Sequence, residues 1–199
     1  MRKTLNFVFL PALACLSAIF FPCLLEAQYE YLSTMNYNNL ALTQVGNIPG
    51  VGWVEVDNTT YDANHQRFFF LGGALVTGPW RLYTINAVAG STVSSPLCPP
   101  GGASAGQVVG LQYDNMTDTI YGLYLTAGSA TLLVWIDTAT GIPHTISSLT
   151  NFSGYSESTF DTRDNIYILS GNGEITGLNA STGAVVYQFS ICNARNAIQ

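Results

Sequence analysis

One serine stands in a pattern that could provide a catalytic nucleophile. The segment GASAG at residues 102–106 matches the G-x-S-x-G pattern of a nucleophile elbow. Such an elbow needs a strand before the serine and a helix after it. Here two prolines and a glycine come first, and an alternating strand pattern over residues 108–113 follows. We therefore predict a loop between strands at this point, and no catalytic residue.

Histidines and repeated acids are the candidate metal ligands. His65 and His144 stand alone in or beside turns, without the cysteine or histidine spacing of a zinc site. Asp62, Asp114 and Asp161 recur once per repeat and could surround a calcium ion. Calcium takes about six to eight oxygen ligands, whereas each repeat supplies one or two. We interpret these acids as turn caps and predict no metal and no cofactor.

Aromatic side chains are abundant, with 11 Tyr, 10 Phe and 3 Trp. Most of them fall on strand positions, where we expect them to pack between sheets. Aromatic ring faces also bind sugars, so Trp53, Trp80 and Trp135 are candidates for carbohydrate contact wherever they are exposed.

An internal repeat must position all of these residues. Each copy begins with a strand that ends in an aromatic residue and Asp, and its third strand ends at a five-residue turn that finishes in Gly. Asp or Asn at the head of such a turn bonds to backbone amides, and Gly at its end accepts a positive φ. The three copies cover residues 51–98, 107–150 and 155–192, with second strands at 67–71, 119–124 and 165–169, third strands at 81–85, 132–136 and 174–178, and fourth strands at 91–97, 143–149 and 184–191.

This repeat predicts an all-β fold of about twelve strands in three four-stranded antiparallel sheets, without a helix longer than about two turns after residue 27. The aromatic-Asp strand ends and the Asp-x-x-Thr-Gly turn, over residues 40–192, resemble secreted β-propellers of the quinoprotein and lactonase-like superfamily. The resemblance implies propeller-type blades. Closed propellers have about four to eight blades. Three blades therefore imply an open or incomplete ring: a fragment, an open arc, or a ring completed by another copy.

The first 27 residues have the layout of a secretory signal peptide, with a basic start, an apolar stretch and the small residue Ala27. A membrane anchor is the alternative, but the uninterrupted apolar run is shorter than the ~20 residues of a membrane span. We predict a secreted, extracellular chain that starts near Gln28. Residues 28–50 would form an N-terminal segment with an outer strand, and residues 51–199 the repeat domain.

The predicted mature chain is acidic. It keeps four arginines, no lysine and eleven acidic residues, which gives a net charge of about −7. Such a surface disfavours nucleic acids and anionic membranes.

Two cysteines, Cys98 and Cys192, remain after processing, at matching strand ends in repeats one and three. With a whole repeat between them, we expect a separation beyond the ~7 Å disulfide limit and no intramolecular bond. The thiols would be free or would pair between chains. Four sequons at predicted turns are glycosylation candidates: Asn58, Asn115, Asn151 and Asn179.

These features together favour a non-catalytic binding or scaffold module, whose partner is an extracellular protein, a carbohydrate or a second copy. One alternative is a fragment or subunit of a lactonase-like or quinoprotein-like enzyme, which needs a polar or metal cluster at the ring axis or cofactor residues around it. Another is a subunit of an extracellular surface assembly.

Overall fold

The computed structural model describes residues 30–35, 39–48, 51–73, 79–149, 155–171 and 173–191. The predicted signal segment, Asn151 and Cys192 lie outside these residues. Within them, every regular element is a strand except the short 3-10 turn η1 (Gly102–Ser104).

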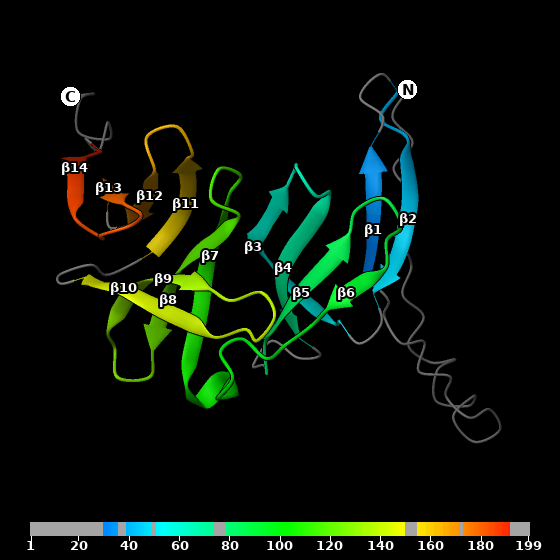
Figure 1. Ribbon diagram of the computed structural model, residues 1–199, viewed down its shortest axis with the longest axis horizontal. Helices are drawn as coiled ribbons and strands as arrows, with labels where there is room; N and C mark the ends of the chain where they lie inside the picture. The colour runs from blue at the N-terminus through cyan, green and yellow to red at the C-terminus, as the bar shows by residue number, and fades with distance from the viewer. Residues whose placement is uncertain are drawn as a thin grey trace, which may run out of the picture.

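An N-terminal hairpin and three four-stranded antiparallel sheets make up the fold (Figure 1). In each sheet the strands lie side by side in chain order. The hairpin pairs β1 (Glu30–Met35) with β2 (Leu42–Ile48). Sheet 1 contains β3 (Trp53–Asp62), β4 (Arg67–Gly73), β5 (Arg81–Asn86) and β6 (Thr92–Ser94); sheet 2 contains β7 (Gly106–Asp114), β8 (Thr119–Thr126), β9 (Thr131–Ile136) and β10 (Pro143–Leu149); sheet 3 contains β11 (Tyr155–Asp161), β12 (Ile166–Gly171), β13 (Glu174–Asn179) and β14 (Val185–Ser190).

The predicted all-β class and the three four-stranded sheets are confirmed, and the described sheets form an open array. The fourth strand of repeat one is shorter than predicted. It ends at Ser94 and is followed only by an isolated bridge between Arg81 and Leu97. Pro96 lies just before this bridge and has no amide hydrogen to donate, which interrupts the ladder.

The third repeat differs from the predicted alignment by one residue. Gln66, Asp118 and Asn165 share a φ of 54–56°. All three therefore end the turn between the first and second strands, and β12 begins at Ile166, one residue later than predicted. Side chains alternate between the two faces of a strand. Each residue of β12 therefore lies on the face opposite to the one that the predicted alignment implies. Tyr167 consequently faces sheet 2, where its hydroxyl donates to the carbonyl oxygen of Gly110 at 2.6 Å.

The core lies between successive layers of the array. Three buried clusters fill the spaces from the hairpin to sheet 1, from sheet 1 to sheet 2, and from sheet 2 to sheet 3. Equivalent aromatic pairs recur: Phe69 stacks on Tyr113 with ring centroids 5.6 Å apart, and Tyr121 stacks on Phe160 at 5.2 Å. At these positions the aromatic residues pack between sheets, as predicted.

The turns between the third and fourth strands of each sheet pack closely against the sheet or hairpin that comes before it in the chain. Gly90, Gly141 and Gly183 have φ values of 65°, 73° and 71°. A Cβ atom on any of them would overlap atoms of the preceding outer strand or its extension, namely Gly46, Leu97 and Ser147 respectively. Glycine is thus required both by the turn and by the close approach.

Candidate functional site

The repeated aspartates are the last residues of β3, β7 and β11, and each accepts hydrogen bonds from residues of the turn that follows. Asp62 Oδ1 accepts from the amides of Asn64 and His65 at 3.0 Å each. Asp114 accepts from the Met116 amide at 3.0 Å and from the Thr117 hydroxyl at 2.6 Å. Asp161 accepts from the amides of residues 163 and 164 at 3.0 and 3.3 Å. This geometry fits the turn-capping role expected for these residues.

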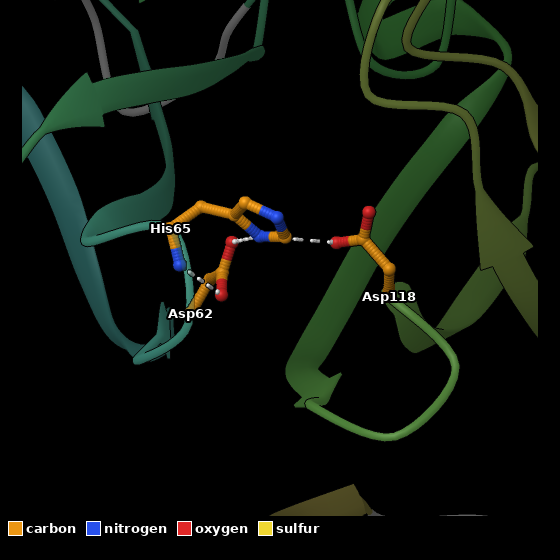
Figure 2. A group of neighbouring side chains, drawn as sticks. All are labelled: Asp62, His65 and Asp118. Carbon is orange, nitrogen blue, oxygen red and sulfur yellow. Dashed lines mark hydrogen bonds and ion pairs between the residues drawn. The ribbon is translucent and has the colours of Figure 1, made fainter.

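One of these aspartates also belongs to a cluster of candidate metal ligands. Figure 2 shows Asp62, at the end of β3, and His65, in the β3–β4 turn of sheet 1, facing Asp118 in the β7–β8 turn of sheet 2. Their ligand atoms all lie within 4.8 Å of one another. His65 Nδ1 is 2.9 Å from Asp62 Oδ2 and 3.9 Å from Asp118 Oδ1.

A guanidinium group occupies the centre of this cluster. Arg67 Nη2 lies 2.7 Å from Asp62 Oδ2 and 2.7 Å from Asp118 Oδ1, and Arg67 Nε donates to Asp62 Oδ2 at 2.7 Å. Tyr113 also donates its hydroxyl to Asp118. The guanidinium therefore already occupies the carboxylate oxygens that a cation would need, and it neutralises one of their two negative charges. We therefore read the cluster as an ion-pair network that joins sheet 1 to sheet 2.

Burial and hydrogen bonding compete at Asp62, whose side chain is 0% exposed. Burial acts to raise the pKa of this carboxyl. Hydrogen bonds from the His65 amide, the Arg67 guanidinium and the His65 ring outweigh burial and hold the pKa below its ordinary value. Burial, together with the bond to Asp118, raises the pKa of Tyr113. Asp62 therefore stays ionised and the tyrosine stays neutral at neutral pH.

A second feature is a groove between sheets 2 and 3, around Trp135. It has a volume of about 520 Å³ and is lined by Thr119, Tyr121, Trp135, Thr145, Ile146, Ala180 and Ser181. Trp135 is 40% exposed. Its ring stacks on His144 in the neighbouring strand, with centroids 4.0 Å apart and planes within 10°. The sequence singled out Trp135 and His144 separately, but not their contact.

The other candidate residues are not brought together into one site. Ser104 lies in η1 directly before β7 and donates its hydroxyl to the Gly101 carbonyl at 3.0 Å, so the strand–serine–helix order of a nucleophile elbow is absent there. Trp80 is buried, whereas Trp53 is 43% exposed.

The sequon asparagines occupy different environments. Asn115 lies in a turn, where its Oδ1 accepts from the Ala63 amide at 3.1 Å, and Asn179 is the last residue of β13, where its Oδ1 accepts from the Ser181 amide at 3.1 Å. Asn58 was expected in a turn, but it lies within β3 and is 1% exposed. Its Oδ1 accepts from the Gly110 amide at 2.7 Å. Glycosylation of these residues stays a prediction.

Cys98 is free and 0% exposed, in the core between sheets 1 and 2. The sequence suggested that this thiol could bridge two copies. Burial corrects that expectation for Cys98, because a disulfide to another chain needs an accessible sulfur.

The sequence matches no protein-family model and no curated protein. Among solved structures, TolB from Acinetobacter baumannii superposes with a TM-score of 0.53 at 11% identity, over 81% of this chain and 38% of TolB. BamB from Moraxella catarrhalis gives a TM-score of 0.42 at 15% identity, over 74% of this chain and 40% of BamB. The chain thus spans less than half the length of either. No helix of the described segments is long and apolar enough to cross a membrane. The likeness to TolB, with the three four-stranded antiparallel sheets, shows that this chain has a partial β-propeller-like fold.

Proposed function

We propose that the chain is a secreted, non-catalytic scaffold module that pairs with a second copy through the outer face of sheet 3. The observation that supports the proposal is an apolar face of sheet 3 at the end of the described array. Its residues occupy strand positions whose counterparts in sheets 1 and 2 are buried against the next sheet. The left end of the array in Figure 1 is this sheet. Secretion rests on the signal-like pattern of residues 1–27.

Two rows of side chains cross the outer face of sheet 3. One row contains Ile168, Gly177 and Tyr187, and the next contains Ser170, Ile175 and Phe189. Tyr187 and Phe189 stack with centroids 5.9 Å apart, and Phe189 is 53% exposed. A hollow of about 250 Å³ lies beside Ile168 and Ile175.

The matching positions in the other sheets are covered. Counting from the repeated Asp, Ile168 corresponds to Phe69 and Tyr121, both of which stack on the next sheet. Among the described strands, none is paired or packed in the same way against the outer face of sheet 3. Exposed apolar patches of this kind mark interaction sites.

A polar position repeats in the same way. Thr60 Oγ1 accepts from the Tyr113 amide at 2.9 Å, which ties sheet 1 to sheet 2. Gln112 Nε2 donates to the Ser158 carbonyl at 3.1 Å, which ties sheet 2 to sheet 3. Thr159 is the next member of this series and is exposed. It could provide the same kind of contact to a partner sheet.

The opposite end of the array supports pairing between like faces. Leu40, with a φ of 56° and 68% exposure, stands in the hairpin turn where the repeats have glycine. A leucine side chain there blocks the close approach that the turn glycines make, which disfavours a further layer on the hairpin. When the same face of two copies pairs, the assembly is a closed dimer with two-fold symmetry.

Sedimentation analysis of the purified secreted chain tests the proposal. We expect a dimer for the wild type, and a monomer for Phe189→Asp and Ile168→Lys. The control is Val93→Lys, at a 63% exposed valine on the outer strand of sheet 1, which should remain dimeric. Phe189 is already exposed, so its variant should fold even if Ile168→Lys does not. A wild type that stays monomeric at about 100 µM, a concentration well above micromolar affinities, would refute the proposal.

A further inference from the structure

We propose that the groove between sheets 2 and 3 binds a neutral sugar, with the indole of Trp135 as the platform for one pyranose ring. This site is separate from the outer face of sheet 3, and it does not depend on dimerisation.

The platform is held in place before any ligand arrives. Trp135 lies directly opposite His144 in the β9–β10 ladder, and the two rings are stacked at 4.0 Å. The imidazole covers part of the indole, Trp135 is 40% exposed overall, and the residue lines the groove. A ring that is already fixed loses little conformational freedom on binding.

Hydroxyl groups surround this platform. Thr145 and Ser181 are exposed, and Thr119 lines the groove on the β8 side. Ser181 Oγ accepts from Asn165 Nδ2 at 2.8 Å, so its own proton can be donated to a ligand. The other atom of that amide, Asn165 Oδ1, is buried without a hydrogen-bond partner in the described part of the chain. Because this oxygen is buried and Asn165 does not line the groove, the amide positions Ser181 and does not itself contact a ligand.

The chemistry of the lining selects the ligand class. A pyranose has an apolar C–H face, which suits an aromatic ring, and hydroxyls at its edge, which suit the threonines and Ser181. Neither an acidic residue nor an arginine or lysine lines the groove. The chain is also acidic overall, with a formal charge of −6. These features disfavour phosphorylated or acidic sugars. The volume of about 520 Å³ lies in the usual range for small-molecule sites.

A matched pair of tryptophan variants tests the site. Trp135→Ala and Trp53→Ala remove indoles of nearly equal exposure, 40% and 43%. The probes are methyl β-glucoside, maltose and N,N′-diacetylchitobiose, with adenine as a flat aromatic ligand that contains no sugar ring. Binding is followed by saturation-transfer NMR on the ligand and by tryptophan emission. Urea unfolding of each variant checks the fold.

We expect at least one sugar to bind the wild type with a dissociation constant of about 1 mM. Trp135→Ala should weaken that binding at least about tenfold, equivalent to about 1.4 kcal/mol, and Trp53→Ala should leave it unchanged. Trp135→Tyr keeps a platform and should restore part of the affinity. Phe189→Asp, which disrupts the proposed dimer, should bind sugar normally.

Three outcomes would overturn the sugar site. One is the absence of saturable binding by all three sugars in the wild type. The second is an equal loss in Trp53→Ala. The third is adenine binding that depends on Trp135 while no sugar binds, which would assign the groove to flat aromatic ligands instead.

Discussion

Replacing Asp62 with alanine should destabilise the chain far more than the same change at Asp161. Both residues cap the turn after the first strand of their sheet. Asp62 additionally accepts from Arg67 Nε and His65 Nδ1 at 2.7 and 2.9 Å, with its side chain fully buried. Its loss would leave the guanidinium without its buried partner.

The expected difference follows from these contacts. Loss of a turn or helix cap costs about 1 kcal/mol, and we expect that value for Asp161→Ala. Breaking a buried ion pair by removing one partner costs about 3–5 kcal/mol. Arg67 is 28% exposed and retains Asp118, so we expect the lower end, about 3 kcal/mol, for Asp62→Ala. The difference of about 2 kcal/mol corresponds to about 4–8 °C in Tm for a chain of this size.

Urea unfolding followed by tryptophan emission measures both variants against the wild type. Asp62→Asn separates the two roles, since an amide can still cap the turn but carries no charge. We expect it to fall between the wild type and Asp62→Ala. Equal losses for Asp62→Ala and Asp161→Ala would show that the Arg67 network adds nothing beyond capping, and the reasoning on inter-sheet ion pairing would then be wrong.

The lowered pKa of Asp62 means that its stabilisation is complete above the ordinary carboxyl value and is lost as the pH falls towards the lowered folded value. As the pH falls below about 4, the wild type should therefore lose stability more steeply than Asp62→Asn in urea unfolding. Burial raises the pKa of Cys98 to about 12, so mass spectrometry should find iodoacetamide on this thiol only after unfolding; alkylation in the folded chain at the rate of a free thiol would contradict its burial. Gly141→Ala should cost about 3 kcal/mol, from positive-φ strain plus overlap with the Leu97 backbone. Gly173 has a similar φ of 77°, but a Cβ atom there would have no atom within 4 Å, so Gly173→Ala should cost only about 1 kcal/mol. Equal losses for the two variants in thermal unfolding would show that overlap with Leu97 adds no cost.

The sequence predicted the fold well because each repeat carries its own local signals. Aromatic-Asp strand ends and Asx-to-Gly turns are set by a few neighbouring residues, and these define strands and hairpins without long-range information. The one-residue error in repeat three had a local cause. Asn165 adopts a φ of 54° and belongs to the turn, yet next to Ile166 it reads equally well as the first residue of a strand.

The candidate sites depended on contacts that the sequence does not encode locally. Arg67 and Asp118 are 51 residues apart in the chain and meet only because sheets 1 and 2 stack in one register. The groove around Trp135 similarly needs the β13–β14 turn of sheet 3 to lie against sheet 2, which places Ser181 near Trp135. Such placement follows from inter-sheet packing, which turn and strand patterns leave open.

The backbone of Gly110 in β7 shows how the three sheets are held in one alignment although the chain has few charged residues. The Gly110 amide donates to Asn58 of sheet 1 at 2.7 Å, and the Gly110 carbonyl accepts from Tyr167 of sheet 3 at 2.6 Å. Gly110 has a φ of 67°, and a Cβ there would come within 2.5 Å of the Tyr167 hydroxyl oxygen. Apolar faces can slide past one another, whereas these directional bonds hold in one alignment only. Asn58 is 1% exposed in this arrangement, so we expect a glycan attached to Asn58 before folding to disturb the native alignment of the three sheets.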